Sequence, residues 1–370
     1  METIIRKIRG KGDEGLFHKA GELIRQGELV AFPTETVYGL GGNGLEASSA
    51  AKIYKAKGRP SDNPLILHIA DRKELGFLVR EVPAAAEKLI EAFWPGPLTL
   101  IFLKSDIVPR ETTGGLDTVA VRMPSHPAAA ALIQAAGVPV AAPSANASGR
   151  PSPTCAAHVY EDLKGRIPLI LDGGDSPIGL ESTIVDVSRR IPEILRPGYI
   201  GMEALRDVLG TVALDPAVWG KAQSEDAPRA PGMKYRHYAP RVPLTLLEGE
   251  DNCRAAYILE KAREAIREGK RIGALVSRET LPCYGQEQPG NLLLFPLGER
   301  SKDESIARRL FAALRQLDSW DLTHVYSETF GEGPLGDAIM NRLRKAAAFQ
   351  VLQIKEDSKN TQEERNEQAE

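Results

Sequence analysis

Strand-like and helix-like segments alternate along most of the chain, and this alternation limits the folds open to it. Apolar residues recur at helical spacing over 13–27, and a short apolar run typical of a buried strand follows at 29–32. Further strands are expected at 65–69, 98–103, 118–123, 138–142, 167–171, 183–187 and 193–196, and helices at 46–57, between 72 and 93, and at 127–136. This order predicts an α/β fold with a large, twisted mixed sheet flanked by helices over residues 1–209.

The pattern breaks between residues 210 and 242, where prolines recur and interrupt any helix or central strand, so we expect a linker. Over 243–355, strands at 244–247, 272–276, 292–295 and 323–327 alternate with helices at 252–268, 303–317 and 337–347. That order predicts a smaller, Rossmann-like, doubly wound α/β domain. Residues 356–370 carry six acids and two bases with no aliphatic side chain larger than alanine, which predicts a disordered acidic tail.

Charge and cysteine content exclude several classes of protein. The formal net charge of -3 argues against a strongly basic nucleic-acid clamp. Cys155, Cys253 and Cys283 form no paired-cysteine motif that would build a zinc ribbon or a redox site. No signal peptide and no apolar run long enough to span a membrane occur, so we expect a soluble, cytoplasmic protein.

Familiar catalytic motifs are also missing. The sequence has no P-loop, GxSxG elbow, HExxH helix or cysteine–histidine pair, which disfavours covalent catalysis and predicts no metal ligands on the protein. The segment 331–336 has the spacing of a dinucleotide fingerprint, but it lies near the end of its domain rather than in an opening βαβ unit. A helix-entry turn is therefore favoured there over a nucleotide site.

Polar residues instead gather at strand ends and turns of the first domain. The segment 33–42 brings hydroxyls, a carboxylate and glycines directly after a strand, where α/β sheets bind ligands, although an ordinary turn explains it equally well. Lys57 and Arg59 flank Gly58 at a helix end, where they are either dipole partners or a holder for an anion. His68 lies in an apolar strand and is by default a satisfied core histidine.

Three more segments add cations and hydroxyls. Thr118 and Arg122 share one face of a strand, so Arg122 needs an anionic partner if it points inward, or forms an edge salt bridge. Residues 142–152 are small and hydroxyl-rich, which lets a phosphate approach the backbone, unless they form a simple capped turn. Segments 180–183 and 195–198 are weaker signals. Together these segments favour a ligand that carries a polyphosphate and a carboxylate.

Several of these segments together resemble a known family. Lys57-Gly58-Arg59, Ser144-Ala145-Asn146, the loop from Pro33 to Gly39 and the run from Pro231 to Pro240 are similar to the long, two-domain form of the threonylcarbamoyl-AMP synthases, which joins a YrdC-like domain to a C-terminal domain. The resemblance implies an enzyme that converts ATP, L-threonine and bicarbonate into threonylcarbamoyl-AMP and pyrophosphate. That product is the donor for N6-threonylcarbamoyladenosine at position 37 of ANN-decoding tRNAs.

The resemblance also implies roles for individual residues. Lys57 and Arg59 would be catalytic, screening the two reacting anions, with Mg²⁺ carried by ATP. ATP would contact Arg59, Asn63, Thr118, Ser144, Asn146, Ser152, Arg196 and Tyr238. Threonine would contact Thr36, His68, Arg122, the Ala142 backbone and Ser182. The contact from Tyr238 implies that the linker folds over the site as a lid.

Other functions stay open on the sequence. A non-enzymatic RNA-binding module is the main alternative, which the net charge weakens. A carbamoyltransferase of the hydrogenase-maturation type would need a longer chain and paired cysteines. A nucleotide-binding regulatory C-terminal domain has only the segment 331–336 in its favour. Handover of the product to the tRNA threonylcarbamoyl-transferase complex would follow from the family.

Overall fold

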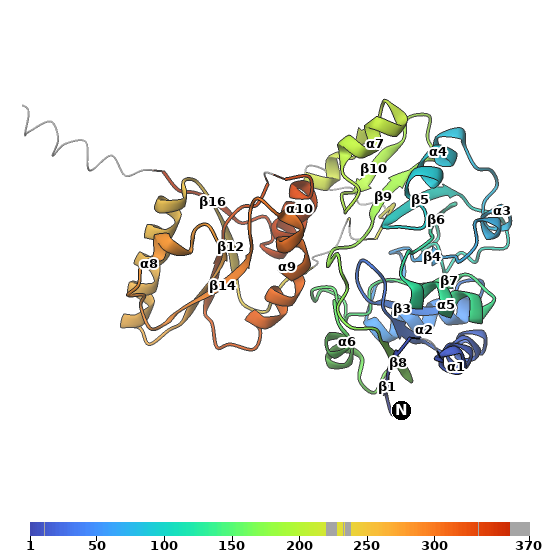
Figure 1. Ribbon diagram of the computed structural model, residues 1–370, viewed down its shortest axis with the longest axis horizontal. Coiled ribbons are helices and arrows are strands. Elements are labelled where there is room, and N and C mark those ends of the chain that lie inside the picture. The colour runs from blue at the N-terminus through green and yellow to red at the C-terminus, as the bar shows by residue number, and fades with distance from the viewer. Residues whose placement is uncertain (11, 220–227, 232, 234–237, 332, 356–370) are drawn as a thin grey trace, which may run out of the picture.

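The computed structural model describes residues 1–10, 12–219, 228–231, 233, 238–331 and 333–355. They form two β-sheets with their own helices, on opposite sides of the molecule (Figure 1). We call residues 1–219 the N-terminal domain and residues 244–355 the C-terminal domain. No helix within the described ranges is long and apolar enough to cross a membrane.

The N-terminal domain is built on one mixed sheet of eleven strands, in the order β1-β8-β2-β3-β7-β4-β6-β5-β9-β10-β11. The strands are β1 (Ile4–Lys7), β2 (Val30–Phe32), β3 (Gly39–Asn43), β4 (Ile66–His68), β5 (Leu98–Leu103), β6 (Thr118–Arg122), β7 (Val140–Ala141), β8 (Leu169–Asp172), β9 (Thr183–Asp186), β10 (Glu193–Arg196) and β11 (Ala213–Leu214). The parallel strands β4 and β6 pair with His68 opposite Arg122, which brings two of the predicted site residues together.

Helices surround this sheet, and one of them ends at the predicted site. They are α1 (Glu14–Arg25), α2 (Ala47–Lys57), η1 (Arg72–Glu74), α3 (Leu75–Leu78), α4 (Ala84–Phe93), α5 (Pro127–Ala136), α6 (Ala156–Leu163), α7 (Met202–Leu209) and η2 (Pro216–Trp219). Helix α2 ends because Gly58 takes the left-handed conformation, with φ of 63°, which glycine adopts without steric cost. The chain reverses there, so Lys57 and Arg59 leave the helix end in a fixed arrangement.

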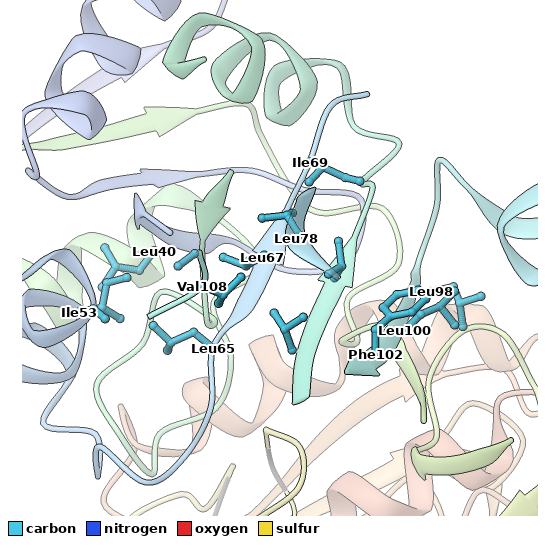
Figure 2. Close-up of a cluster of buried hydrophobic side chains, with 14 of the residues drawn as sticks. Leu40, Ile53, Leu65, Leu67, Ile69, Leu78, Leu98, Leu100, Phe102 and Val108 are labelled. Carbon is cyan, nitrogen blue, oxygen red and sulfur yellow. The ribbon is translucent and has the colours of Figure 1, made fainter. Parts of the chain in front are cut away.

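The core of the N-terminal domain lies between the sheet and its helices (Figure 2). Leu40 of β3 and Ile53 of α2 pack in the same cluster as Leu67 of β4 and Leu100 and Phe102 of β5, and all five are at most 1% exposed. Full burial of each large apolar side chain contributes about 1.5–3 kcal/mol. These strands therefore form a rigid frame for the polar loops at their ends.

The C-terminal domain is a doubly wound sheet of five parallel strands, in the order β14-β13-β15-β12-β16. The strands are β12 (Leu244–Glu248), β13 (Ile272–Ser277), β14 (Leu292–Gly298), β15 (His324–Ser327) and β16 (Val351–Gln353), and the helices are α8 (Asp251–Arg267), η3 (Leu281–Tyr284), α9 (Asp303–Leu317) and α10 (Gly336–Ala346). Helix α8 packs on one face, and α9 and α10 pack on the other, towards the N-terminal domain (Figure 1). The predicted α/β fold class is thus confirmed for both sheets.

Helices α9 and α10 hold the two domains together with apolar and ionic contacts. Val37 and Leu180 of the N-terminal domain belong to the same buried cluster as the apolar faces of these helices. Arg315 of α9 donates to Asp162 at 2.7 Å and to the carbonyl of Pro151 at 2.6 Å, and this ion pair is buried. The backbones approach so closely that a Cβ on Gly179 would lie 2.5 Å from a backbone atom of α9.

The structure contains elements that the sequence pattern did not predict. Strands β1, β3 and β16, the two-residue strand β11, and helices α6 and α7 were missed. The segment 33–42 was interpreted as a loop, yet its glycine-rich end forms β3, where Phe32 packs against Gly39 and Gly41 and leaves no room for a Cβ. Strand β11 pairs with β10, so the first sheet continues past residue 209 into the predicted linker.

Two predicted segments fall wholly or partly outside the described residues. The predicted tail, 356–370, lies outside them, as do residues 220–227, 232 and 234–237 of the predicted linker, 210–242. The domain limits at 209 and 243 and the closing motion of the linker stay predictions.

Candidate functional site

A polar cleft lies where the loops after β2 and β7, the end of α2, and strands β4 and β6 meet. It contains about 700 Å³ of empty space, part of it open to solvent. Its lining residues are Thr34, Thr36, Val37, Tyr38, Gly39, Lys57, Arg59, Ile66, His68, Arg122, Ala142, Pro143, Ser144, Asn146, Ser148, Gly149, Ser152, Glu181, Ser182, Arg196, Pro231 and Tyr238. The lining includes one lysine and three arginines, which ordinarily carry a positive charge at neutral pH, and a single carboxylate, that of Glu181. The cleft therefore suits an anionic ligand.

Arg122 lines the cleft and has a buried carboxylate beside it. Its Nη2 donates to Glu35 at 2.6 Å, its Nη1 to the Thr36 hydroxyl at 2.9 Å, and its Nε to the carbonyl of Gly96 at 3.3 Å. A guanidinium has five N–H groups, so two of those of Arg122 have no partner within the described part of the chain and remain for a ligand. Burial opposes the charge of Glu35, but Arg122 outweighs it and leaves the pKa of Glu35 below its ordinary value.

His68 stands next to Arg122 and is uncharged at neutral pH. Burial, together with the charge of Arg122, lowers the pKa of the His68 imidazole to about 3. Its Nδ1 lies 3.1 Å from the carbonyl oxygen of Ile66, which can only accept, so Nδ1 carries the proton. Phe32 packs edge to face against the ring, which fixes its orientation. Of these two neighbours, Arg122 therefore carries the positive charge and His68 is neutral.

Lys57 supports the loop that follows β7. Its ammonium donates to the carbonyls of Ser144 and Asn146, the latter at 2.7 Å, and to the side-chain oxygen of Asn146 at 3.3 Å. The Asn146 amide in turn donates to the carbonyl of Arg150 at 2.9 Å. Lys57 and Asn146 together therefore connect residues 144 to 150 of this loop by hydrogen bonds. Burial, followed by the charge of Arg59, lowers the pKa of Lys57 well below its ordinary value.

Arg59 is oriented by Asn63. The Asn63 side-chain oxygen accepts from Nη2 at 2.5 Å, and the Asn63 carbonyl accepts from Nε at 3.2 Å. Asn63 itself is buried and does not line the cleft. Burial lowers the pKa of Arg59 to about 10, so this arginine stays charged at neutral pH. Asn63 therefore fixes the orientation of Arg59.

Another wall of the cleft is formed by Arg196 and the residues around Ser182. Arg196 donates from Nε and Nη2 to the carbonyl of Ser182, at 3.1 and 2.9 Å, and from Nη2 to its hydroxyl at 3.2 Å. The Ser182 hydroxyl also lies 2.7 Å from that of Thr99 on β5. Burial lowers the pKa of Arg196 to about 10, which leaves it charged at neutral pH.

Glu181 and Tyr238 also line the cleft. The Glu181 carboxylate accepts from the Ser152 hydroxyl at 2.5 Å and from Nε of Arg342, a residue of α10, at 3.0 Å. Tyr238 has a positive φ of 64°, is buried, and stacks on Phe311 of α9 at 5.1 Å between ring centres. The C-terminal domain therefore contributes directly to the surroundings of the cleft.

Most, but not all, of the predicted site residues meet in this cleft. Those that line it are Thr36, Lys57, Arg59, His68, Arg122, Ala142, Ser144, Asn146, Ser152, Ser182, Arg196 and Tyr238. Asn63 and Thr118 do not. Thr118 shares a strand face with Arg122, but four residues of strand separate their Cα atoms by about 13 Å.

Four residues that were not predicted to have a role lie at or behind the cleft: Tyr38, Glu35, Glu181 and Arg342. Tyr38 and Glu181 line it, Glu35 pairs with Arg122, and Arg342 pairs with Glu181. Glu35 and Glu181 stood in segments that already attracted attention. Arg342 gave no signal, because its partner lies 161 residues away in the sequence.

Two observations concern metal binding and the segment 331–336. In the described part of the chain, no group of three or more His, Cys, Asp or Glu residues could hold a metal ion. In the segment 331–336, a Cβ on Gly333 would lie 2.2 Å from Asp303 at the start of α9, and one on Gly336 would lie 2.6 Å from the carbonyl of Gly331. Both glycines are therefore explained by close packing of a turn that leads into α10.

Comparison with known proteins gives matches over nearly the whole chain. A family model described as "Telomere recombination" matches residues 22–198, and one described as "Threonylcarbamoyl-AMP synthase, C-terminal domain" matches residues 200–348. A threonylcarbamoyl-AMP synthase of Pyrococcus abyssi is 47% identical and covers 95% of this chain and 100% of its own length. One of Bacillus subtilis is 45% identical, covering 90% and 93%.

A solved structure agrees with these matches. The crystal structure of P. abyssi Sua5 complexed with L-threonine superimposes with a TM-score of 0.88 at 46% identity. The match covers 95% of this chain and 100% of that one. Both domains are therefore shared with that protein.

Proposed function

This chain belongs to the threonylcarbamoyl-AMP synthase family, and on that premise we propose that it converts ATP, L-threonine and bicarbonate into threonylcarbamoyl-AMP and pyrophosphate. The threonine amine takes up carbon dioxide from bicarbonate to form a carbamate. A carbamate oxygen then bonds to the α-phosphorus of ATP as the bond from that phosphorus to the α,β-bridging oxygen breaks, and the β- and γ-phosphates leave together as pyrophosphate. The product is the donor for the N6-threonylcarbamoyl group of adenosine 37 in ANN-decoding tRNAs.

The observation that carries this proposal is a single cleft in which an arginine with spare N–H groups lies near a second set of cations. Arg122 retains two N–H groups, enough to bind one carboxylate in a bidentate manner. We assign these to the carboxylate of threonine, with Thr36, His68, Ser182 and the Ala142 backbone around the rest of the amino acid.

The other cations suit the triphosphate. Arg59 is held by Asn63, and the small residues of the loop 142–152 leave room for a phosphate to approach the backbone. Two anions, carbamate and phosphate, must meet in the reaction, so fixed positive charge lowers the repulsion between them. In this arrangement Arg59 faces the reacting groups, while Lys57 keeps the loop in place through Ser144 and Asn146. Mg²⁺ enters with the triphosphate as part of the substrate.

The setting of the reaction belongs to the same proposal. The product carries a reactive acyl phosphate linkage and is consumed by a transferase that acts on tRNA, so a handover to the tRNA threonylcarbamoyl-transferase complex follows. We place both steps in the cytoplasm. Tyr238, buried between the cleft and α9, lies where a cover over the labile intermediates is needed.

The test measures pyrophosphate release from ATP with threonine and bicarbonate each present or omitted, together with detection of threonylcarbamoyl-AMP by mass spectrometry. We expect release that needs both co-substrates. A double variant, Lys57→Ala with Arg59→Ala, should lose it, whereas Lys55→Ala should retain it because Lys55 is exposed on the same helix. Absence of release from folded wild-type protein under every combination would refute the proposal and favour the RNA-binding alternative.

A further inference from the structure

An arginine of the C-terminal domain is buried behind the wall of the cleft. Arg342 of α10 is completely buried and donates from Nε to Glu181 at 3.0 Å and from Nη1 to the carbonyl of Pro197. Its Nη2 has no hydrogen-bond partner among the described residues. A buried guanidinium left partly unpaired is costly, so its position calls for an explanation beyond the stability of the interface.

Glu181 connects Arg342 to the cleft through hydrogen bonds. One carboxylate oxygen faces Arg342, and the other accepts from the Ser152 hydroxyl at 2.5 Å. Burial opposes the charge of Glu181, but Arg342 and then Arg196 outweigh it and hold the pKa of Glu181 below its ordinary value. Both Glu181 and Ser152 line the cleft, whereas Arg342 does not.

The direction of the hydrogen bond from Ser152 follows from this pairing. A carboxylate only accepts, so the Ser152 hydroxyl must donate its one proton to Glu181. Its oxygen then faces the cleft with lone pairs only. Such a group binds a donor, and a phosphate at neutral pH supplies none, whereas a ribose hydroxyl or the amino group of adenine does.

We propose that Arg342 is a positioning residue that holds the Glu181 carboxylate and thereby makes Ser152 a hydrogen-bond acceptor for a donor group on the nucleoside of ATP. This inference rests on the proposed function for the identity of the nucleotide. It gives the C-terminal domain a part in nucleotide recognition, through one side chain on α10.

Titration calorimetry with ATP on the full-length chain tests the proposal, since binding needs neither threonine nor bicarbonate. Analogues remove one donor group each: 2′-deoxy-ATP, 3′-deoxy-ATP, and purine riboside triphosphate, which lacks the amino group. Wild type should bind one of these about tenfold more weakly than ATP, as expected for one lost hydrogen bond. Ser152→Ala should bind that analogue and ATP equally.

Variants of α10 test the role of Arg342. Arg342→Met should weaken ATP binding about tenfold and reduce the discrimination against that analogue, while Arg342→Lys should restore part of both. Asn341→Ala is the matched control, because Asn341 neighbours Arg342 and its buried amide donates to the carbonyl of Val218 rather than to the cleft wall. It should keep the discrimination of wild type.

The proposal is overturned if Ser152→Ala, on folded protein, discriminates as wild type does, or if wild type binds all three analogues as it binds ATP. It is also overturned if Asn341→Ala lowers the discrimination as much as the Arg342 variants do. Should Arg342→Met not fold, Arg342→Lys and Ser152→Ala carry the test. Intact ATP binding without synthesis would count against the proposed function and leave this inference standing.

Discussion

Replacing Arg122 by lysine should separate the charge of this residue from its geometry. The ammonium of lysine keeps the positive charge next to Glu35, so the buried carboxylate retains a partner. Lysine lacks the planar, forked guanidinium that in Arg122 leaves two N–H groups for a carboxylate. A hydrogen bond to a charged group contributes about 1.5–3 kcal/mol, so the loss of one raises the KM for threonine about 10- to 100-fold.

Initial rates of pyrophosphate release, measured at saturating ATP and bicarbonate over a range of threonine, report this change. The kcat should fall much less than KM rises, because Arg122 binds the carboxylate and not the reacting phosphorus. L-Threoninamide, which lacks the negative charge, should inhibit wild type and Arg122→Lys with similar constants. Arg189→Lys, a substitution of an exposed arginine that keeps the charge next to Asp186, is the control and should match wild type.

One result would refute the reasoning. If Arg122→Lys folds and keeps the wild-type KM for threonine, the two remaining N–H groups do not bind the carboxylate. The same conclusion follows if wild type binds L-threoninamide as tightly as threonine.

Three other changes probe the frame of the cleft. Lys57→Met should raise the KM for ATP and lower the free energy of unfolding by about 1–3 kcal/mol in chemical denaturation, because loop carbonyls lose their donor. His68 has a pKa of about 3 in the folded state, whereas in the unfolded chain it binds a proton below about pH 6.5. The free energy of unfolding therefore falls as pH drops below about 6.5, by about 2 kcal/mol at pH 5. Between pH 7 and 5, His68→Gln should lose about 2 kcal/mol less of its free energy of unfolding than wild type does. Gly198→Ala should lower the melting temperature, because its Cβ would lie 2.3 Å from the backbone nitrogen of Thr183. Gly15→Ala is the control and should not lower it, because a Cβ there has nothing within 4 Å. Equal melting temperatures for the two variants would contradict the predicted clash.

The sequence predicted the strands and helices best where apolar periodicity is strong. Strand β5 and helix α9 were predicted with their observed limits, because the apolar pattern extends over all six residues of the strand and all fifteen of the helix. Strand β3 was missed, since its glycines carry no such pattern and are explained only by Phe32, which packs on them. Strand β11 has two residues and depends entirely on pairing with β10.

The site was predicted through residues near each other in sequence and missed where partners are distant. Lys57 and Arg59 stand beside a left-handed glycine, which a local pattern reveals. Thr118 was expected at ATP through the resemblance; it shares a strand face with Arg122 but does not line the cleft, because a shared face does not fix the position along the strand. No local pattern relates Glu35 to Arg122, 87 residues away, because tertiary folding brings them together.

The placement of β1 has a consequence for synthesis on the ribosome. This strand forms one edge of the large sheet and, among the described residues, pairs only with β8, where Ile4 lies opposite Leu169. At roughly 5–20 residues per second, β1 waits about 10–30 seconds for its partner to be made. During that time its exposed isoleucines could pair with another nascent chain, and the adjacent charges of Arg6 and Lys7 disfavour such pairing.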